Sequence, residues 1–218
     1  MKIYSLQDFI KYLDANGELV RIKTEVDAKL EVTEISIRAL QQGMPALLFE
    51  NVKGAKFPLA MNVLASDKRI ELALGKHPDQ LGEELITFME DAMPPNPKVF
   101  FKHPGTTRRI ISAIPRTTFR STSQEVVSQP NLDDLPVITS WPDDGGPFIT
   151  LPQVFTYDPR DGKRNLGMYR MQVFDNQTTG MHWQIQKGGG FHFYQAKKMG
   201  KDFKIAVALG TDPALLLA

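Results

Sequence analysis

Apolar residues recur at helical spacing in the first ninety residues and alternate there with short apolar runs. Residues 5–8 resemble a capping box in which Asp replaces the usual Glu or Gln, and they predict a helix that Gly17 ends. Residues 18–26 alternate as a strand, and residues 30–42 predict a second amphipathic helix. Strands are then expected at 46–49, which reads as buried, and at 57–64, with helices from 66 to 74 and from 79 to about 93. This order of elements predicts an N-terminal α/β domain.

Prolines and small polar residues interrupt the pattern in the middle of the chain. The Pro-Pro-Asn-Pro segment at 94–97 breaks the preceding helix. Residues 106–129 are rich in Arg, Thr and Ser without helical spacing, and they predict strands and a linker that crosses to a second domain. The loop at 141–147 is either a plain connection or a place where the backbone approaches a ligand closely. We therefore expect domains at residues 1–115 and 116–218.

Two apolar stretches in the second half of the chain predict a β-hairpin. Residues 154–157 and 165–173 read as strands, and the segment between them contains a proline and an Asp-Gly turn signal. Strict alternation places Leu166, Met168, Arg170 and Gln172 on one face. A buried arginine on that face requires an anionic partner. This partner is either a substrate or, alternatively, a carboxylate of the protein at the edge of a sheet, where Arg170 could also extend its head to solvent.

A run of three glycines separates the next two predicted elements, a strand at 181–186 and a helix at 191–199. Backbone N–H groups at the start of such a helix can cradle a phosphate, whereas the alternative is a mobile loop with a solvated Lys187. The run matches neither the Walker motif nor G-x-G-x-x-G. His182 and His192 lie ten residues apart, a spacing that no common metal motif uses, so each is expected to be structural or exposed.

The end of the chain predicts a buried strand at 205–209 and a short apolar helix. Asp212 is the expected N-cap of that helix and Pro213 its first residue. One capped turn with three adjacent leucines is not stable alone, so we expect it to pack on something further along a longer chain.

Composition excludes several classes of protein. The 26 basic and 25 acidic residues give a net charge of +1 without a basic block, which argues against nucleic-acid binding and against a polybasic membrane anchor. Cysteine is absent, which excludes disulfides and thiolate chemistry. The N-terminus lacks the apolar core of a signal peptide, and no apolar run approaches the length of a transmembrane segment. We expect a cytoplasmic protein, with peripheral membrane association as the alternative location.

Several motifs together resemble one known family. They are Leu-Gln-Asp-Phe-Ile at 6–10 with Gly-Glu-Leu-Val at 17–20, residues 45–52, Trp-Pro-Asp-Asp-Gly-Gly-Pro at 141–147, residues 165–170, and Ala-Leu-Gly-Thr-Asp-Pro at 208–213. In this order they resemble the prenylated-flavin-dependent decarboxylases of the UbiD family, whose members are considerably longer. The resemblance implies an α+β fold, in which the N-terminal α/β domain precedes an incomplete split β-barrel of the flavin-reductase type.

The resemblance also implies an activity, namely the reversible, non-oxidative decarboxylation of an aromatic or α,β-unsaturated carboxylic acid. A 4-hydroxybenzoate-type acid, a precursor of ubiquinone or menaquinone, is the expected substrate. Prenylated FMN is the implied cofactor, with Mn²⁺ and K⁺ joining its phosphate to the protein. A flavin prenyltransferase would supply the cofactor, and the chain would form a homo-oligomer or be completed by a C-terminal chain. The alternative is a non-catalytic module that binds flavin, phosphate or a protein partner.

The site residues are implied position by position. Asn165 corresponds to the family's asparagine ligand of the divalent metal, and its amide oxygen suits Mn²⁺. Arg170 corresponds to the arginine that faces the substrate carboxylate, which a guanidinium binds bidentately. The other implied cofactor contacts are Met168, Tyr169, His182, Trp183, Gln184, Lys187 and Gly188.

This chain departs from the family pattern in several places. Trp183 is the one firm match in its tripeptide, and Gly188 stands where some members carry a histidine ligand. The family's glutamate ligand and its catalytic acid lie beyond the equivalent of Ala218, so the chain alone is expected to be inactive. Asn165 and Arg170 also have opposite parity on an ideal strand. Either a bulge at Gly167 re-aims one of them, or their contacts come from the strand's end and its backbone.

Overall fold

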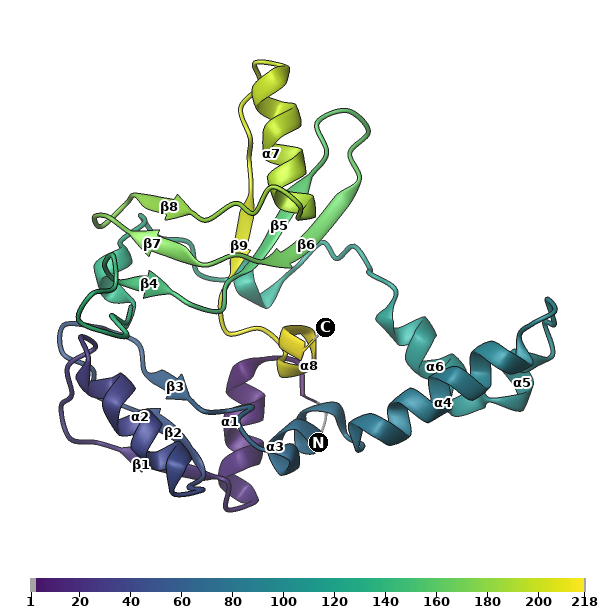
Figure 1. Ribbon diagram of the computed structural model, residues 1–218, viewed down its shortest axis with the longest axis horizontal. Coiled ribbons are helices and arrows are strands. Elements are labelled where there is room, and N and C mark those ends of the chain that lie inside the picture. The colour runs from purple at the N-terminus through teal and green to yellow at the C-terminus, as the bar shows by residue number, and fades with distance from the viewer. Residues whose placement is uncertain (1–2, 218) are drawn as a thin grey trace. The chain divides into compact units, whose positions relative to one another are not determined.

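The computed structural model describes residues 3–217, which form an α+β fold with two compact units (Figure 1). Unit 1 comprises the residues up to Arg69 together with those from Pro130 onwards, and unit 2 comprises Ile70–Gln129. The residues named for the candidate site all belong to unit 1.

The first part of unit 1 is the predicted α/β arrangement. Ser5 caps the first helix, because its Oγ accepts a hydrogen bond of 3.2 Å from the N–H of Asp8. The central strand is apolar and buried along its whole length, as expected for a strand covered on both faces. It pairs in parallel with the first strand and antiparallel with the third. The elements are α1 (Leu6–Ala15), β1 (Leu19–Ile22), α2 (Glu31–Gln41), β2 (Ala46–Phe49) and β3 (Leu59–Met61), with sheet order β1-β2-β3.

The second part of unit 1 contains two antiparallel sheets, of order β4-β7-β8 and β6-β5-β9. The predicted hairpin is confirmed, because Gln153 pairs with Met168 and Tyr157 with Arg164. Each sheet has three strands and is open, and the two sheets do not form a closed barrel, so the incomplete split β-barrel that the resemblance implies stays a prediction. The elements are η2 (Leu132–Asp134), β4 (Phe148–Ile149), β5 (Gln153–Tyr157), β6 (Arg164–Met168), β7 (Met171–Val173), β8 (Thr179–Met181), α7 (Gly188–Lys198), β9 (Ala206–Ala208) and α8 (Pro213–Leu217).

The predicted single strand at 165–173 is wrong. It is two strands, β6 and β7, which belong to different sheets and are separated by Tyr169 and Arg170. The pairing of β5 with β6 runs without interruption through Gly167, so the first of the two alternatives, a bulge at this residue, is wrong. The change of sheet turns Tyr169 inward, where it is buried. It also removes the parity problem, because Asn165 and Arg170 no longer share one strand.

Three predictions near the end of the chain also need correction. The strand expected at 181–186 ends at Met181, and the helix expected at 191–199 begins at Gly188, so the glycines form its first turn. The strand at 205–209 is not buried: β9 lies at the edge of its sheet with Val207 exposed. The final cap is confirmed, because Asp212 Oδ1 accepts a hydrogen bond of 2.8 Å from the N–H of Ala214.

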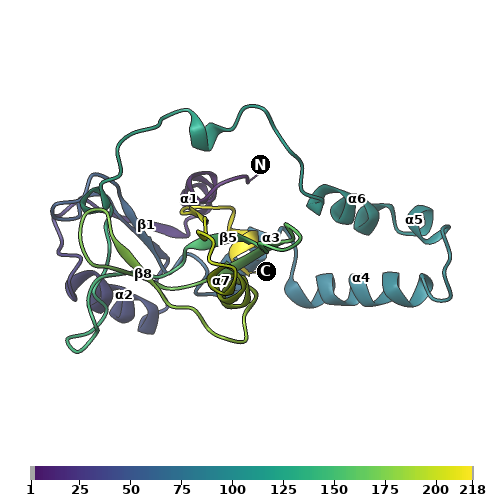
Figure 2. The same ribbon diagram turned by 90° about the horizontal axis from the view of Figure 1, so that it is seen from above.

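The regular elements among the described residues of unit 2 are all helices, joined by turns and irregular segments, so the strands predicted for 106–129 are wrong. Pro104 occupies the first position of a helix, where its missing N–H costs nothing, and the β-branched residues that follow are tolerated on an exposed surface. Figure 2 shows the second part of this unit folding back beside its longest helix. The elements are α3 (Asp67–Leu74), which spans the boundary with unit 1, α4 (Pro78–Asp91), α5 (Val99–Lys102), α6 (Pro104–Ala113) and η1 (Thr122–Gln124). Among the described helices, none has the length and hydropathy to span a membrane.

Candidate functional site

Several of the predicted site residues meet at the start of α7. The backbone N–H of Gly189 donates a hydrogen bond of 2.8 Å to the hydroxyl of Tyr169, in a buried position. A Cβ on Gly189 would lie 2.6 Å from the Trp183 ring and 2.8 Å from Cζ of Tyr169. A Cβ on Gly190 would collide with the carbonyl oxygen of Gln184. The glycines therefore let a helix N-terminus approach the sheet more closely than residues with side chains would permit.

Aromatic rings hold this helix against its neighbours. The rings of Tyr169 and Trp183 lie 5.0 Å apart, and the Trp183 ring stacks on Phe193 at 6.0 Å. Phe203 meets the edges of both Trp183 and Phe193. In Figure 1, α7 stands against β5 and β6. Its first turn is thus fixed by packing from two sides, which orients the N–H groups that this turn does not use internally.

Asn165 lies beside the first residue of α7. Its Nδ2 is 3.3 Å from Oγ1 of Thr156 and 3.4 Å from the hydroxyl of Tyr169. Its Oδ1 points at Gly188, where a Cβ would collide with it. The structure therefore brings together four of the residues singled out from the sequence: Asn165, Tyr169, Trp183 and Gly188.

Behind Asn165 lies a buried polar row that the sequence did not reveal. Thr156 Oγ1 is 3.0 Å from Nδ1 of His192, and Nε2 of that ring is 4.0 Å from Oδ2 of Asp158. Arg160 donates to Asp158 through Nε at 3.0 Å, Nη2 at 2.7 Å and its backbone N–H at 2.9 Å. These hydrogen bonds from Arg160 hold the pKa of the Asp158 carboxyl well below its usual range. His192 is accordingly structural, as expected.

The side chain of Arg170 contacts Asp144 and Phe148. Its Nη2 donates to Oδ2 of Asp144 at 2.6 Å, and its Cζ lies 3.6 Å from the centre of the Phe148 ring. Asp144 is almost buried, whereas about two fifths of the Arg170 side chain is exposed. In this structure the anionic partner of Arg170 is the carboxylate of Asp144. Asp144 comes from the loop at 141–147, which thus positions a charged group.

The remaining predicted site residues do not converge on Asn165 with their side chains. Met168, His182, Gln184 and Lys187 are all exposed. Gln184 contributes its backbone oxygen, which accepts a hydrogen bond of 3.0 Å from the N–H of Lys187 and so closes the turn before α7. A further backbone contact joins the N–H of His182 to the carbonyl oxygen of Arg170 at 3.2 Å.

The polar atoms at the start of α7 and on Asn165 determine whether this site could hold a phosphate or a metal ion. A phosphate fits the start of α7, because that turn is built from glycines and has no acidic residue. A divalent metal finds one hard, neutral ligand in the Asn165 oxygen. Across residues 3–217, no three His, Cys, Asp or Glu side chains gather where they could hold a metal ion. The phosphate is therefore accommodated by this chain, while a metal would need phosphate oxygens or ligands from elsewhere.

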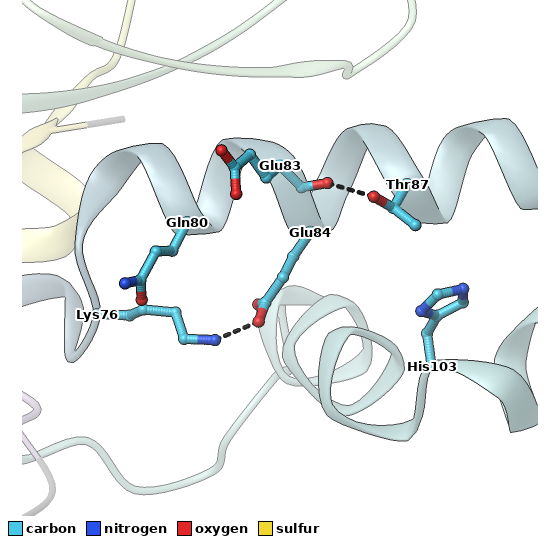
Figure 3. Close-up of a pocket in the computed structure, with 6 residues that line it drawn as sticks. All are labelled: Lys76, Gln80, Glu83, Glu84, Thr87 and His103. Atoms are coloured by element: carbon cyan, nitrogen blue, oxygen red, sulfur yellow. Dashed lines mark hydrogen bonds and ion pairs between the residues drawn. The ribbon is translucent and has the colours of Figure 1, made fainter.

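The hollow drawn in Figure 3 lies in unit 2 and contains no predicted site residue. Lys76 forms an ion pair with Glu84, which lowers the pKa of that carboxyl, and Thr87 Oγ1 donates to the backbone oxygen of Glu83 at 2.8 Å. Its polar groups are thus largely paired with one another along α4. We assign it no chemistry.

Two family models match the chain. The 3-octaprenyl-4-hydroxybenzoate carboxy-lyase N-terminal domain covers residues 10–89, and the Rift-related domain of the same carboxy-lyase covers residues 116–218. An uncharacterized protein of Archaeoglobus fulgidus is 43% identical over 220 residues, which are 100% of this chain and 45% of the relative. A Chlamydia pneumoniae protein named as a 4-hydroxybenzoate decarboxylase subunit is 37% identical over 98% of this chain and 36% of its own length. The chain spans less than half the length of these relatives.

Solved structures are similar over almost the whole chain. The vanillic acid decarboxylase ShVdcCD of Sedimentibacter hydroxybenzoicus, in closed form, has a TM-score of 0.80 at 27% identity, covering 99% of this chain and 45% of that one. The UbiD-class enzyme HmfF of Pelotomaculum thermopropionicum, in complex with FMN, has a TM-score of 0.78 at 26% identity, covering 98% and 44%. An evolved dimeric form of HmfF, in complex with prFMN, has a TM-score of 0.73 at 25% identity, covering 98% and 46%.

Proposed function

We propose a function on the premise that this chain belongs to the UbiD family of carboxy-lyases. The chain forms the cofactor-binding part of a decarboxylase, which is either longer than this chain or assembled from two chains. Its reaction is the reversible, non-oxidative decarboxylation of an aromatic or α,β-unsaturated acid of the 4-hydroxybenzoate type. The names of the relatives support this class, since they include a 4-hydroxybenzoate and a vanillic acid decarboxylase.

The observation that carries the proposal is the contact between Asn165 and the start of α7. An amide oxygen and a glycine-built helix N-terminus lie side by side, which is an arrangement suited to a phosphate together with a cation. The phosphate of prenylated FMN is the proposed occupant, with Mn²⁺ at Asn165 and K⁺ nearby. When bound, prenylated FMN supplies the electron sink for loss of CO₂.

Arg170 is the residue of this chain that we propose for substrate binding. Asp144 and Phe148 hold its guanidinium from two sides, so the arginine loses little side-chain freedom when it binds a carboxylate. A guanidinium offers five N–H donors, of which one is used by Asp144 in the described contact. The residual donors can orient the substrate's carboxylate. The general acid that returns a proton to the product comes from outside this chain.

The assembly around this site completes the proposal. The two open sheets belong to a split β-barrel of the flavin-reductase type, and the chain divides into domains at residues 1–115 and 116–218. A flavin prenyltransferase supplies the cofactor, and a C-terminal chain or further copies of the protein complete the enzyme. The name of ShVdcCD and the designation of the Chlamydia pneumoniae relative as a subunit support an assembly of several chains. We propose the cytoplasm as its location, in a pathway that handles quinone precursors.

Native mass spectrometry and absorbance spectroscopy test the proposal. The chain is co-produced with a flavin prenyltransferase and Mn²⁺, and the expected result is a retained prenylated flavin with its characteristic absorbance. The variant N165A should lose the metal and weaken flavin retention, whereas the matched control N176A, in an exposed turn, should retain both. An apo mass for a folded wild-type chain would overturn the cofactor-binding part of the proposal. Flavin retention without CO₂ release after addition of a complementing chain would identify a non-catalytic module.

A further inference from the structure

We infer that a buried row of polar groups, from Asp158 through His192 and Thr156 to Asn165, fixes the orientation of the Asn165 amide so that its oxygen faces the start of α7. The amide of asparagine is nearly symmetric in shape, and its two ends have opposite chemistry. An oxygen facing Gly188 can ligate a cation, whereas an NH₂ group there would repel it. The inference thus names positioning residues, and its consequence for metal binding rests on the proposed function.

The central members of the row are buried and lie close to one another. Thr156 is fully buried, and Asp158 and His192 are also buried. The successive separations are 3.3 Å from Asn165 Nδ2 to Thr156 Oγ1, 3.0 Å from Thr156 Oγ1 to His192 Nδ1, and 4.0 Å from His192 Nε2 to Asp158 Oδ2. Three elements contribute: Thr156 lies in β5, Asn165 in β6 and His192 in α7. Thr156 and Asn165 are direct partners in the strand register, which sets their side chains on the same face.

The direction of the row follows from its charged end. Arg160 keeps the Asp158 carboxyl ionised, as its lowered pKa reflects. A neutral imidazole has one N–H and one lone pair, and a carboxylate 4.0 Å from Nε2 favours the N–H there. His192 then presents the lone pair of Nδ1 to Thr156, which donates its O–H to it. The Thr156 oxygen is left as an acceptor, and it takes an N–H of Asn165.

Tyr169 can accept an N–H of the Asn165 amide in the same orientation from a second side. Its hydroxyl oxygen accepts the N–H of Gly189 at 2.8 Å and lies 3.4 Å from Nδ2 of Asn165. Both inner neighbours of the amide, Thr156 and Tyr169, therefore offer it acceptors. The NH₂ end belongs on their side, and Oδ1 is left facing Gly188.

The tautomer of His192 tests the direction of the row without any cofactor. The 218-residue chain is labelled with ¹⁵N-histidine, and the ring nitrogens are recorded at pH 8. Comparison with H192Q assigns the His192 signals among the four histidines. We expect a single Nε2–H tautomer of His192 in the wild type and a mixture of tautomers in D158N. The control variant D161N should keep the wild-type tautomer, because the Asp161 carboxylate that it removes pairs with exposed Lys163. An Nδ1–H or doubly protonated ring in the wild type, or an unchanged single tautomer in D158N, would overturn the inference.

Mn²⁺ binding tests the consequence for the proposed metal ligand. Electron paramagnetic resonance measures the Kd of Mn²⁺ for the chain in the presence of FMN. T156V removes the hydroxyl at nearly constant volume and should weaken Mn²⁺ binding about 10- to 100-fold, the range typical of residues that orient metal ligands. T156S restores the hydroxyl and should recover the wild-type Kd, which a merely structural role of the threonine methyl would not allow. Wild-type affinity in a folded T156V chain would refute the positioning role. Absence of Mn²⁺ binding in the wild type would refute the proposed metal site, while the tautomer would still decide the direction of the row.

Discussion

An alanine at Gly189 provides a direct test of the packing that positions the start of α7. Alanine normally stabilises a helix relative to glycine by about 0.5–1 kcal/mol. At Gly189 the added Cβ would meet the Trp183 ring at 2.6 Å and the Tyr169 hydroxyl at 2.8 Å, distances that real Cβ atoms essentially never show. Overpacking of a closed site costs about 1–3 kcal/mol. The second effect exceeds the first, so we expect G189A to lower the free energy of unfolding by about 1–2 kcal/mol.

Gly82, in the interior of α4, is the matched control, because a Cβ there would meet nothing within 4 Å. G82A should therefore raise the free energy of unfolding of its unit by about 0.5–1 kcal/mol. Urea unfolding followed by far-UV circular dichroism measures both variants, and near-UV circular dichroism reports on the Tyr169 and Trp183 rings in G189A. Opposite signs are the expected outcome. If G189A were as stabilising as G82A, with unchanged aromatic signals, the close approach of α7 to these rings would be refuted.

Three further perturbations probe other parts of unit 1. Because Arg160 lowers the pKa of Asp158, the folded chain keeps this carboxyl ionised at a pH where the unfolded chain takes up a proton. The stabilisation by the ionised Asp158 should be present above about pH 4 and lost as the pH falls. The free energy of unfolding of D158N, measured by urea unfolding at a series of pH values, should therefore depend less steeply on acid pH. R170K should weaken substrate binding about 10- to 100-fold in a completed, loaded enzyme, measured as kcat/KM, because an ammonium can neither bridge a carboxylate bidentately nor stack as well on Phe148. F49A should cost about 3–5 kcal/mol in urea unfolding, since Phe49 is fully buried in the core of the α/β part, and F57A, at an exposed position, should cost far less.

Local signals in the sequence were sufficient for elements whose stability is local. The cap at Ser5, the fully apolar strand β2 and the Asp-Gly hairpin were predicted because each is encoded within a few neighbouring residues. The helix α6 was missed because Pro104 at its start reads as a break and because its one buried residue is Thr106, so no buried apolar stripe marks the helix in the sequence. The change of sheet at Tyr169 was missed for a different reason: strict alternation continues through it, and only tertiary packing breaks the strand.

The residues of the candidate site likewise differ in whether a local signal in the sequence or only tertiary packing indicates them. Asn165, Tyr169 and Gly188 were assigned to the site through motifs, whereas the contacts of Thr156, His192 and Asp144 were not predicted, because no spacing along the chain indicates them. The contact of Thr156 could in principle have been predicted, because the hairpin register makes Thr156 the direct partner of Asn165 and a polar side chain there should contact the amide. His192 required knowledge of how α7 packs on β5 and β6, which depends on three glycines that permit close approach.

The arrangement explains why a glycine run, an asparagine and a buried carboxylate paired with an arginine occur together in one short region. A helix N-terminus favours anions, but this electrostatic preference alone does not fix the positions of the ligand atoms. The close approach of Gly188 sets the distance between the helix and the Asn165 oxygen, and the buried row sets which atom of the amide faces the helix. The Asp158–Arg160 pair then supplies a fixed negative charge that gives the row its direction. Loss of the pair should therefore reverse or mix the amide orientation without moving the backbone, so that metal affinity would fall while α7 stays in place.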